Sequence, residues 1–153
     1  MNRAVFDTNV IVSGFLSPAG PPGRIVEWLR SGIVQAVLDD RIAAEYAKVL
    51  ARLRFGLPSA EVDIVLAAIR LGAVRVEVGP RDRAERLPDP DDASFLECAR
   101  AAGVPVVTGN VRHYPKSVAR AVAVLTPAQF VARVARTTSG RGAWPLYRYH
   151  GAS

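Results

Sequence analysis

The sequence predicts an α/β fold, a three-layer sandwich around a central, mainly parallel sheet of Rossmann-like type. Strand-like apolar runs alternate with segments of helical period, which is typical of parallel sheets joined by helical crossovers. The runs are rich in Val and Ile with little polar alternation, as expected for strands covered on both faces. No repeat or long linker divides residues 1–136, so we expect one domain followed by a tail at 137–153.

Each element rests on its local pattern. A short apolar run marks each predicted strand: Arg3–Phe6, Val34–Leu38, Val74–Val78, Val104–Val107 and Ala121–Leu125. Apolar side chains three and four residues apart mark each predicted helix: Gly23–Arg30, Arg41–Leu53, Ala60–Leu71, Asp92–Ala102 and Pro127–Ala135. The segment Ser17–Gly23 reads SPAGPPG and is predicted as a loop before the first helix.

Length and composition indicate a globular domain. The chain has 153 residues, of which 50% are hydrophobic and 22% are charged, enough for one full core. No apolar run approaches the roughly 20 residues of a membrane span, and the N-terminus lacks a signal-peptide pattern. The single cysteine, Cys98, excludes an internal disulfide and sits among apolar residues, so we expect a core residue in a reducing compartment. We therefore predict a cytoplasmic protein without membrane contact.

Charge is distributed unevenly along the chain. Residues 1–97 hold 12 basic and 14 acidic side chains, whereas residues 98–153 hold 8 basic and no acidic ones. This asymmetry favours a polyanionic partner such as RNA or DNA. Coding bias is the alternative, since 18 of the 20 basic residues are Arg.

The tail interleaves aromatic and basic side chains. Trp144, Tyr147 and Tyr149 stand near Arg148 and His150, a composition that can stack on single-stranded bases. Disorder, or packing on a partner subunit, is the other interpretation of this segment.

The first strand ends in VFDTNV, which places Asp7 at its carboxyl end. Ligands collect at this edge of open α/β sheets. Glu45 borders the apolar stripe of the helix after strand two, early in that helix and near the same edge. Asp39 and Asp40 are predicted to cap this helix. Three other acids are predicted to be solvated charges on helices: Glu27, Glu61 and Glu97.

Asp89-Pro90-Asp91-Asp92 is a strong helix start, with an acidic cap and Pro at the first position. Capping needs one acid, however, and Asp92 is followed by apolar residues at i+3, i+4 and i+7. We therefore expect Asp92 on the inward face with a functional role, and Asp89 or Asp91 as a possible helper.

The fourth strand ends in VVTGN, which brings Thr108 and Asn110 to the carboxyl edge. A plain Gly-Asn turn is the alternative. Strands one and four are neighbours in doubly wound sheets, so Asp7, Glu45, Asp92 and Asn110 are predicted to converge. His113, after the turn, is interpreted as a surface residue or phosphate contact.

Clustered carboxylates need a cation, and hard oxygen ligands suit Mg²⁺ or Mn²⁺. A metal held in this way can activate water for phosphodiester attack. The sequence has no Cys/His cluster for zinc, no P-loop and no Gly-x-Gly-x-x-Gly motif.

The ordered set VFDTNVIVSGFLSPAGPPGRIVEWL, EYAKVL, DPDDASFLECA, VVTGN and VLTPAQF resembles PIN-domain proteins, most closely the VapC-like toxins of toxin–antitoxin systems. The resemblance covers about Arg3 to Arg136. It implies a PIN-like sheet and an endoribonuclease that uses Mg²⁺ or Mn²⁺.

The resemblance also implies roles for single residues. The catalytic, metal-binding acids of the family match Asp7, Glu45 and Asp92, and Asn9 would orient the first of them. The fourth acid of the family is replaced here by Asn110, which removes one negative charge. Asp89 or Asp91 could supply a negative charge in its place. Thr108 and His113 would then serve orientation or substrate contact.

The resemblance implies partners as well: RNA, a small antitoxin that occludes the pocket, and a second copy in a homodimer. A PIN module that binds RNA or protein with little catalysis is the alternative, because of Asn110. Two other phosphate-handling classes fit less well. A dehalogenase-type phosphatase needs Asp where Asn9 stands, and a receiver domain needs a Lys that Leu125–Pro127 does not supply.

Overall fold

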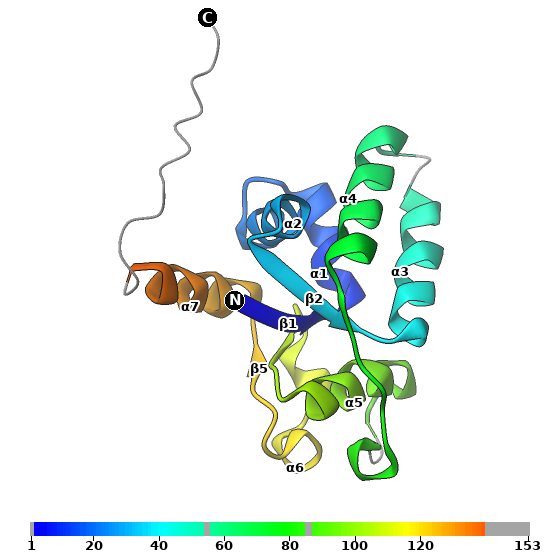
Figure 1. Ribbon diagram of the computed structural model, residues 1–153, viewed down its shortest axis with the longest axis vertical. Helices are drawn as coiled ribbons and strands as arrows, with labels where there is room; N and C mark the ends of the chain where they lie inside the picture. Colours follow the sequence, from blue (N-terminus) through cyan, green and yellow to red (C-terminus); the bar gives the residue numbers. More distant parts are fainter. Residues whose placement is uncertain (1, 54–55, 85–86, 140–153) are drawn as a thin grey trace, which may run out of the picture.

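Five parallel strands form the centre of the molecule. The computed structural model describes residues 2–53, 56–84 and 87–139, so most of the aromatic and basic tail lies outside the described residues. The strands are β1 (Asn2–Phe6), β2 (Val34–Leu38), β3 (Val74–Arg75), β4 (Val106–Val107) and β5 (Val124–Leu125). They follow the order β3-β2-β1-β4-β5, and every neighbouring pair is parallel (Figure 1). The predicted α/β class is confirmed.

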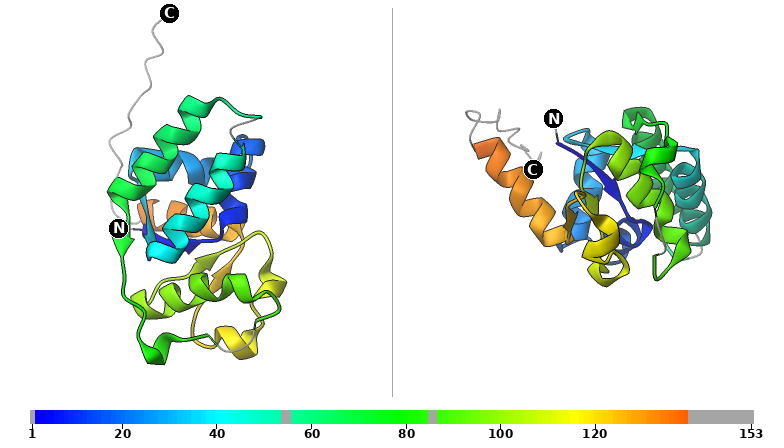
Figure 2. Two further views of the ribbon diagram at one scale, coloured as in Figure 1. Left: turned by 90° about the vertical axis from the view of Figure 1, so that its right-hand side faces the viewer. Right: turned by 90° about the horizontal axis from the view of Figure 1, so that it is seen from below.

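Helices cover both faces of this sheet (Figure 2). They are α1 (Thr8–Leu16), α2 (Pro21–Ser31), α3 (Asp40–Leu53), α4 (Ser59–Gly72), α5 (Ala93–Ala102), α6 (Lys116–Ala119) and α7 (Pro127–Ser139), with short 3₁₀ turns η1 (Pro80–Asp82), η2 (Pro90–Asp92) and η3 (Val111–His113). Helix α2 packs on β2 and against α7, whereas α5 packs on β1 and β2 and against α3. The three layers expected from the sequence are therefore present.

Helix α1 was not predicted. The segment Thr8–Leu16 was assigned to no element, because it has no charged side chain to mark a helix face and is rich in β-branched residues. The helix begins because the Asp7 carboxylate caps it, accepting a hydrogen bond from the Asn9 amide at 3.1 Å. Strands β3, β4 and β5 are shorter than predicted, and α7 continues to Ser139, beyond the predicted end of the helix and of the domain.

Two glycines allow close packing around α2, one against the loop that precedes it and one between α1 and α2. A Cβ at Gly23 would lie 2.0 Å from the Pro18 carbonyl oxygen, and one at Gly14 would lie 2.4 Å from Val26 Cγ2. Both distances are far inside van der Waals contact. The loop predicted at Ser17–Gly23 is shorter than expected, because α2 already begins at Pro21.

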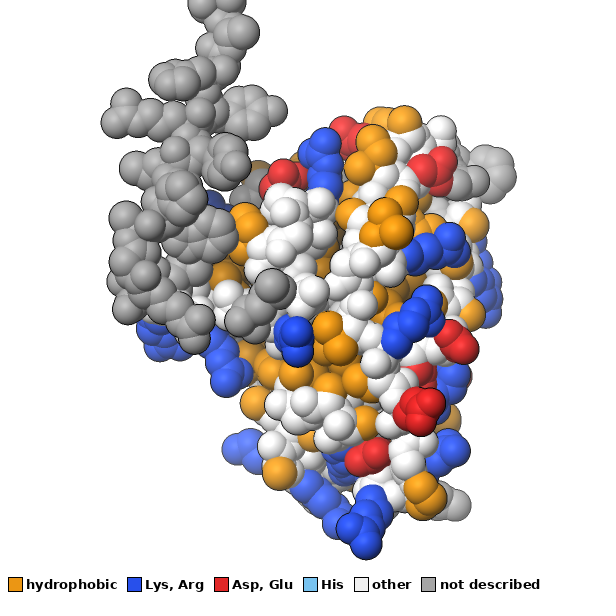
Figure 3. Space-filling view, in the orientation of Figure 1, with side chains coloured by type: hydrophobic (Ala, Val, Ile, Leu, Met, Phe, Trp, Pro, Cys, Tyr) orange, Lys and Arg blue, Asp and Glu red, His pale blue; other side chains and the backbone are white. Residues whose placement is uncertain are grey.

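Basic side chains are frequent along the lower left of the face drawn in Figure 3, where α6 lies in Figure 1. On the same face, hydrophobic side chains lie between the charged ones. In the described part of the chain no helix is long and apolar enough to cross a membrane.

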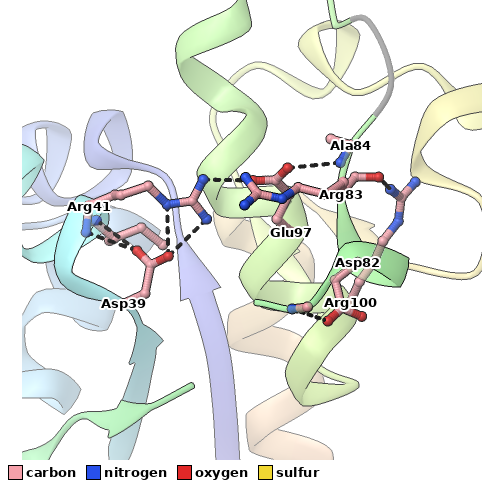
Figure 4. A network of polar contacts seen from close by, with 9 residues as sticks. Asp39, Arg41, Asp82, Arg83, Ala84, Glu97 and Arg100 are labelled. Carbon is pink, nitrogen blue, oxygen red and sulfur yellow. Dashed lines mark hydrogen bonds and ion pairs between the residues drawn. The ribbon is translucent and has the colours of Figure 1, made fainter. Parts of the chain in front are cut away.

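An ion-pair network joins α3 to α5 (Figure 4). Asp39 caps α3, as predicted, accepting from the Arg41 and Ile42 amides at 3.0 and 3.2 Å. Burial opposes the ionisation of Asp39, but the hydrogen bonds from Arg41 and Ile42 outweigh it and hold its pKa below the usual value. Arg41 also pairs with Glu97 at 2.7 Å, and Glu97 accepts from the Ala84 amide at 2.9 Å.

The prediction that Glu97 is a solvated charge is wrong. Its side chain is 5% exposed, because the partners above turn it inward from α5. Its neighbour Cys98 is fully buried, as predicted, and burial followed by the nearby Asp39 carboxylate raises the pKa of its thiol to about 12. Cys98 is therefore a core residue and not a nucleophile.

A candidate metal centre at the carboxyl edge of the sheet

Asp7 lies at the junction of β1 and α1 and is only 6% exposed. One carboxylate oxygen, Oδ1, accepts from the Asn9 amide. The other, Oδ2, accepts from the Thr108 hydroxyl at 3.0 Å and from the Tyr114 hydroxyl at 3.2 Å. Both oxygens are thus fixed by donors, which makes the carboxylate a rigid element of the site.

Strand pairing explains why Asp7 and Thr108 meet. β1 and β4 pair in parallel with Phe6 opposite Val107, and the Asp7 amide donates to the Val107 carbonyl at 2.9 Å. The Asn9 side-chain oxygen then accepts from the Gly109 amide at 3.1 Å. The expected meeting of the first and fourth strands at this edge is therefore observed.

Three side chains that can bind a metal gather beside Asp7. One ligand atom from each of Asp89, Asp92 and His113 lies within 4.8 Å of the other two. Asp89 caps η2, accepting from the Asp91 amide at 3.0 Å, while Asp92 follows at its end and is 7% exposed. The inward position predicted for Asp92 is observed, whereas Asp91 is exposed and outside this group.

His113 connects the group to the loop after β4. Its Nδ1 lies 3.0 Å from Asp92 Oδ2, and its Nε2 lies 2.8 Å from Asn110 Nδ2. A neutral ring with the proton on Nδ1 satisfies both contacts, donating to the carboxylate and accepting from the amide. His113 is therefore part of this group of side chains and more than a surface residue. The backbone N–H of Asn110 donates to Thr108 Oγ1 at 3.0 Å.

The electrostatics of the site favour a cation. Burial, and then the negative charges of Asp7 and Asp89, raise the pKa of Asp92 to about 6, although His113 opposes the shift. Burial and the neighbouring Asp7 raise the pKa of Tyr114, so this hydroxyl keeps its proton and remains a donor. A divalent ion would relieve the repulsion among the carboxylates, and the oxygen-rich donor set with one imidazole fits Mg²⁺ or Mn²⁺.

Glu45 stands apart from these contacts. It is half-buried on α3, and among the described residues it forms no hydrogen bond or ion pair with Asp7 or Asp92. Its role as a metal ligand stays a prediction. The next residue, Tyr46, is fully buried, and its hydroxyl donates to the Phe6 carbonyl just before Asp7.

Sequence reasoning missed both tyrosines. Tyr46 was assigned to the apolar stripe of its helix, and Tyr114 follows His113 without a motif of its own. Their hydroxyls act over separations of 40 and 107 residues, which no local pattern reports.

Comparison with known families gives one match. Residues 3–112 match the PIN domain, well over half of the chain, and the matched range ends just before His113. No match is found among the curated proteins. PIN domains are in general metal-dependent nucleases, and the carboxylate group at the carboxyl edge is compatible with that chemistry. With the all-parallel sheet and this match over β1 to η3, the chain belongs to the PIN domain family.

Proposed function

We propose that this protein is a metal-dependent endoribonuclease that hydrolyses phosphodiester bonds in RNA. The observation that carries the proposal is the buried acid Asp92, which has a pKa raised to about 6 beside Asp89, His113 and Asp7. A carboxyl that is costly to ionise alone becomes a good ligand once a divalent cation is present.

Asp7, Asp89 and Asp92 would hold the cation, with Glu45 and Asn110 as further oxygen donors. When bound, Mg²⁺ or Mn²⁺ lowers the pKa of a coordinated water and neutralises charge on the phosphate. The protein's own part is orientation. Thr108 and Tyr114 fix the Asp7 carboxylate by hydrogen bonds, and such fixed ligands require little rearrangement when the ion binds.

The imidazole of His113 favours Mn²⁺ over Mg²⁺ within this site. Nitrogen ligands suit later transition metals better than Mg²⁺, which prefers oxygen. Asn110 lies on the far ring nitrogen, Nε2, at 2.8 Å. With its amide turned so that Oδ1 accepts from Nε2–H, Asn110 would leave Nδ1 unprotonated and able to bind the ion. His113 would then supply a ligand atom, but no negative charge, in place of the acid that Asn110 replaces.

We further propose that the protein is the toxin of a type II toxin–antitoxin pair, active in the cytoplasm as a homodimer and held inactive by a small antitoxin. Support comes from the sequence resemblance to VapC-like toxins and from family membership. The alternative, a PIN module that binds RNA or protein with little catalysis, is favoured by one observation, the amide at Asn110. Co-purification from the native cell would reveal a bound antitoxin or RNA.

The test combines metal binding with cleavage. Purified protein should gain thermal stability with Mn²⁺ and cut single-stranded RNA, and both effects should disappear in Asp7→Asn and Asp92→Asn. Asp91→Asn is the matched control, because this exposed acid lies next to Asp92 in sequence. His113→Gln should weaken Mn²⁺ binding more than Mg²⁺ binding. RNA cleavage that survives in both site variants would overturn the proposal.

A further inference from the structure

A second hollow lies at the opposite edge of the sheet from the carboxylates. It has a volume of about 520 Å³ and is lined by the segments that lead into β4 and β5, such as Gly103–Pro105 and Ala121–Ala123. Those segments are at the amino ends of their strands, whereas Asp7 and Thr108 are at the carboxyl ends of theirs. The two sites therefore belong to different surfaces of the same sheet.

Four arginines surround this hollow, and we call it the arginine hollow after them: Arg81, Arg100, Arg120 and Arg133. They come from η1, α5, the end of α6 and α7, which are separate parts of the chain. No acidic side chain stands among the described residues that line it. Positive charge gathered in this way attracts anions.

One of the four guanidinium groups is held in place by the backbone. Arg100 donates from Nη1 to the Arg83 carbonyl at 3.1 Å and from Nη2 to the Val118 carbonyl. Both acceptors are neutral carbonyl oxygens. A guanidinium fixed in this way loses little conformational freedom when it binds an anion.

Arg120 adds an independent indication. Its φ is +50°, which makes it the one non-glycine residue with positive φ in the described part of the chain. Such backbone is strained for a residue with a side chain, and glycine would avoid the strain. An arginine at this position, on the rim of a basic hollow, suggests that the side chain is kept for its charge.

We propose that the arginine hollow binds backbone phosphates of single-stranded RNA, at a distance from the bond that is cut. The inference rests on the proposed function for its ligand. Several separate guanidinium groups around an open hollow suit a chain of phosphates better than a single small anion, which two arginines can satisfy. Extended chain from Val104 to Thr108, which includes β4, spans about 13 Å, a separation that a single RNA chain can bridge.

Binding to RNA tests the inference without cleavage. The affinity of a single strand of about 16 nucleotides is measured in EDTA by fluorescence anisotropy over a range of salt concentrations. The double variant Arg81→Gln/Arg133→Gln changes two exposed arginines of the hollow. The control Lys48→Gln/Arg52→Gln removes the same charge from exposed positions on α3.

We expect the hollow variant to bind RNA about tenfold more weakly at 0.1 M salt and to lower the salt slope by about 1.4, or 0.7 for each lost phosphate contact. The control should change neither value. Equal losses in both variants, or no loss in either, would overturn the inference. So would a hollow that binds inorganic phosphate or an acidic peptide while RNA affinity stays unchanged. If no variant cuts RNA but only the hollow variant loses affinity, the proposed nuclease activity fails and this inference stands.

Discussion

Replacing Asp92 with asparagine should make the metal-free protein more stable above pH 6. The folded protein raises the pKa of this carboxyl from 3.8 to about 6, so the folded state holds its proton more tightly than the unfolded state does. Stability is therefore full below pH 4 and is lost as pH rises through 6. One pKa unit is worth about 1.4 kcal/mol, so ionised Asp92 costs the folded protein about 3 kcal/mol, a cost that asparagine avoids.

The assay is urea unfolding in EDTA at about pH 4 and about pH 7.5. The stability difference between Asp92→Asn and the wild type should grow by about 2.5 kcal/mol from the lower to the higher pH. Asp91→Asn, the exposed neighbour, should show the same difference at both. A gain for Asp92→Asn that does not depend on pH would refute the reasoning. Saturating Mn²⁺ should stabilise the wild type and leave the variant unchanged.

Two further substitutions test the packing that supports the site. Gly23→Ala should destabilise the protein by about 3 kcal/mol in urea unfolding, because the new Cβ would meet a backbone oxygen at 2.0 Å; Gly72→Ala, with open space around it, should change stability by less than about 1 kcal/mol. Glu97→Gln should cost about 2 kcal/mol, because a buried charged partner of Arg41 is lost. Glu27→Gln, in an exposed pair, should cost less than about 0.5 kcal/mol, and equal effects at both positions would contradict the buried network.

The five strands and the helices α2, α3, α4, α5 and α7 could be predicted from the sequence, because each of them carries its own period, whereas α1 and the single turn α6 could not. The Val-rich runs at Val34–Leu38 and before Thr108 mark strands whether or not their partners are known. Helix α1 was not predicted because Val10 and Ile11 fit the period of a strand as well as that of a helix. Only the cap at Asp7 marks this segment as a helix. Local patterns give the type of an element only where one period excludes the other.

The candidate site could be predicted in part. Asp7, Asp92 and Thr108 were found because strand ends and helix starts have sequence signals. Tyr114 has no such signal, since its place depends on a contact with a residue 107 positions away. Glu97 was misassigned for a related reason, because the partner that turns it inward lies 56 positions earlier. Long-range polar contacts of this kind become visible only when the chain is folded.

The carboxylates and the arginines lie at opposite ends of the strands, so negative and positive groups are separated along the strand direction. In the field of a polyanion such a molecule turns its basic edge forward before any contact forms. A strand captured there would reach the acids at a fixed distance along its length. The distance between the two edges would then set the length of the shortest RNA that can occupy both. The preference for RNA of at least this length would weaken at high salt, which screens the attraction.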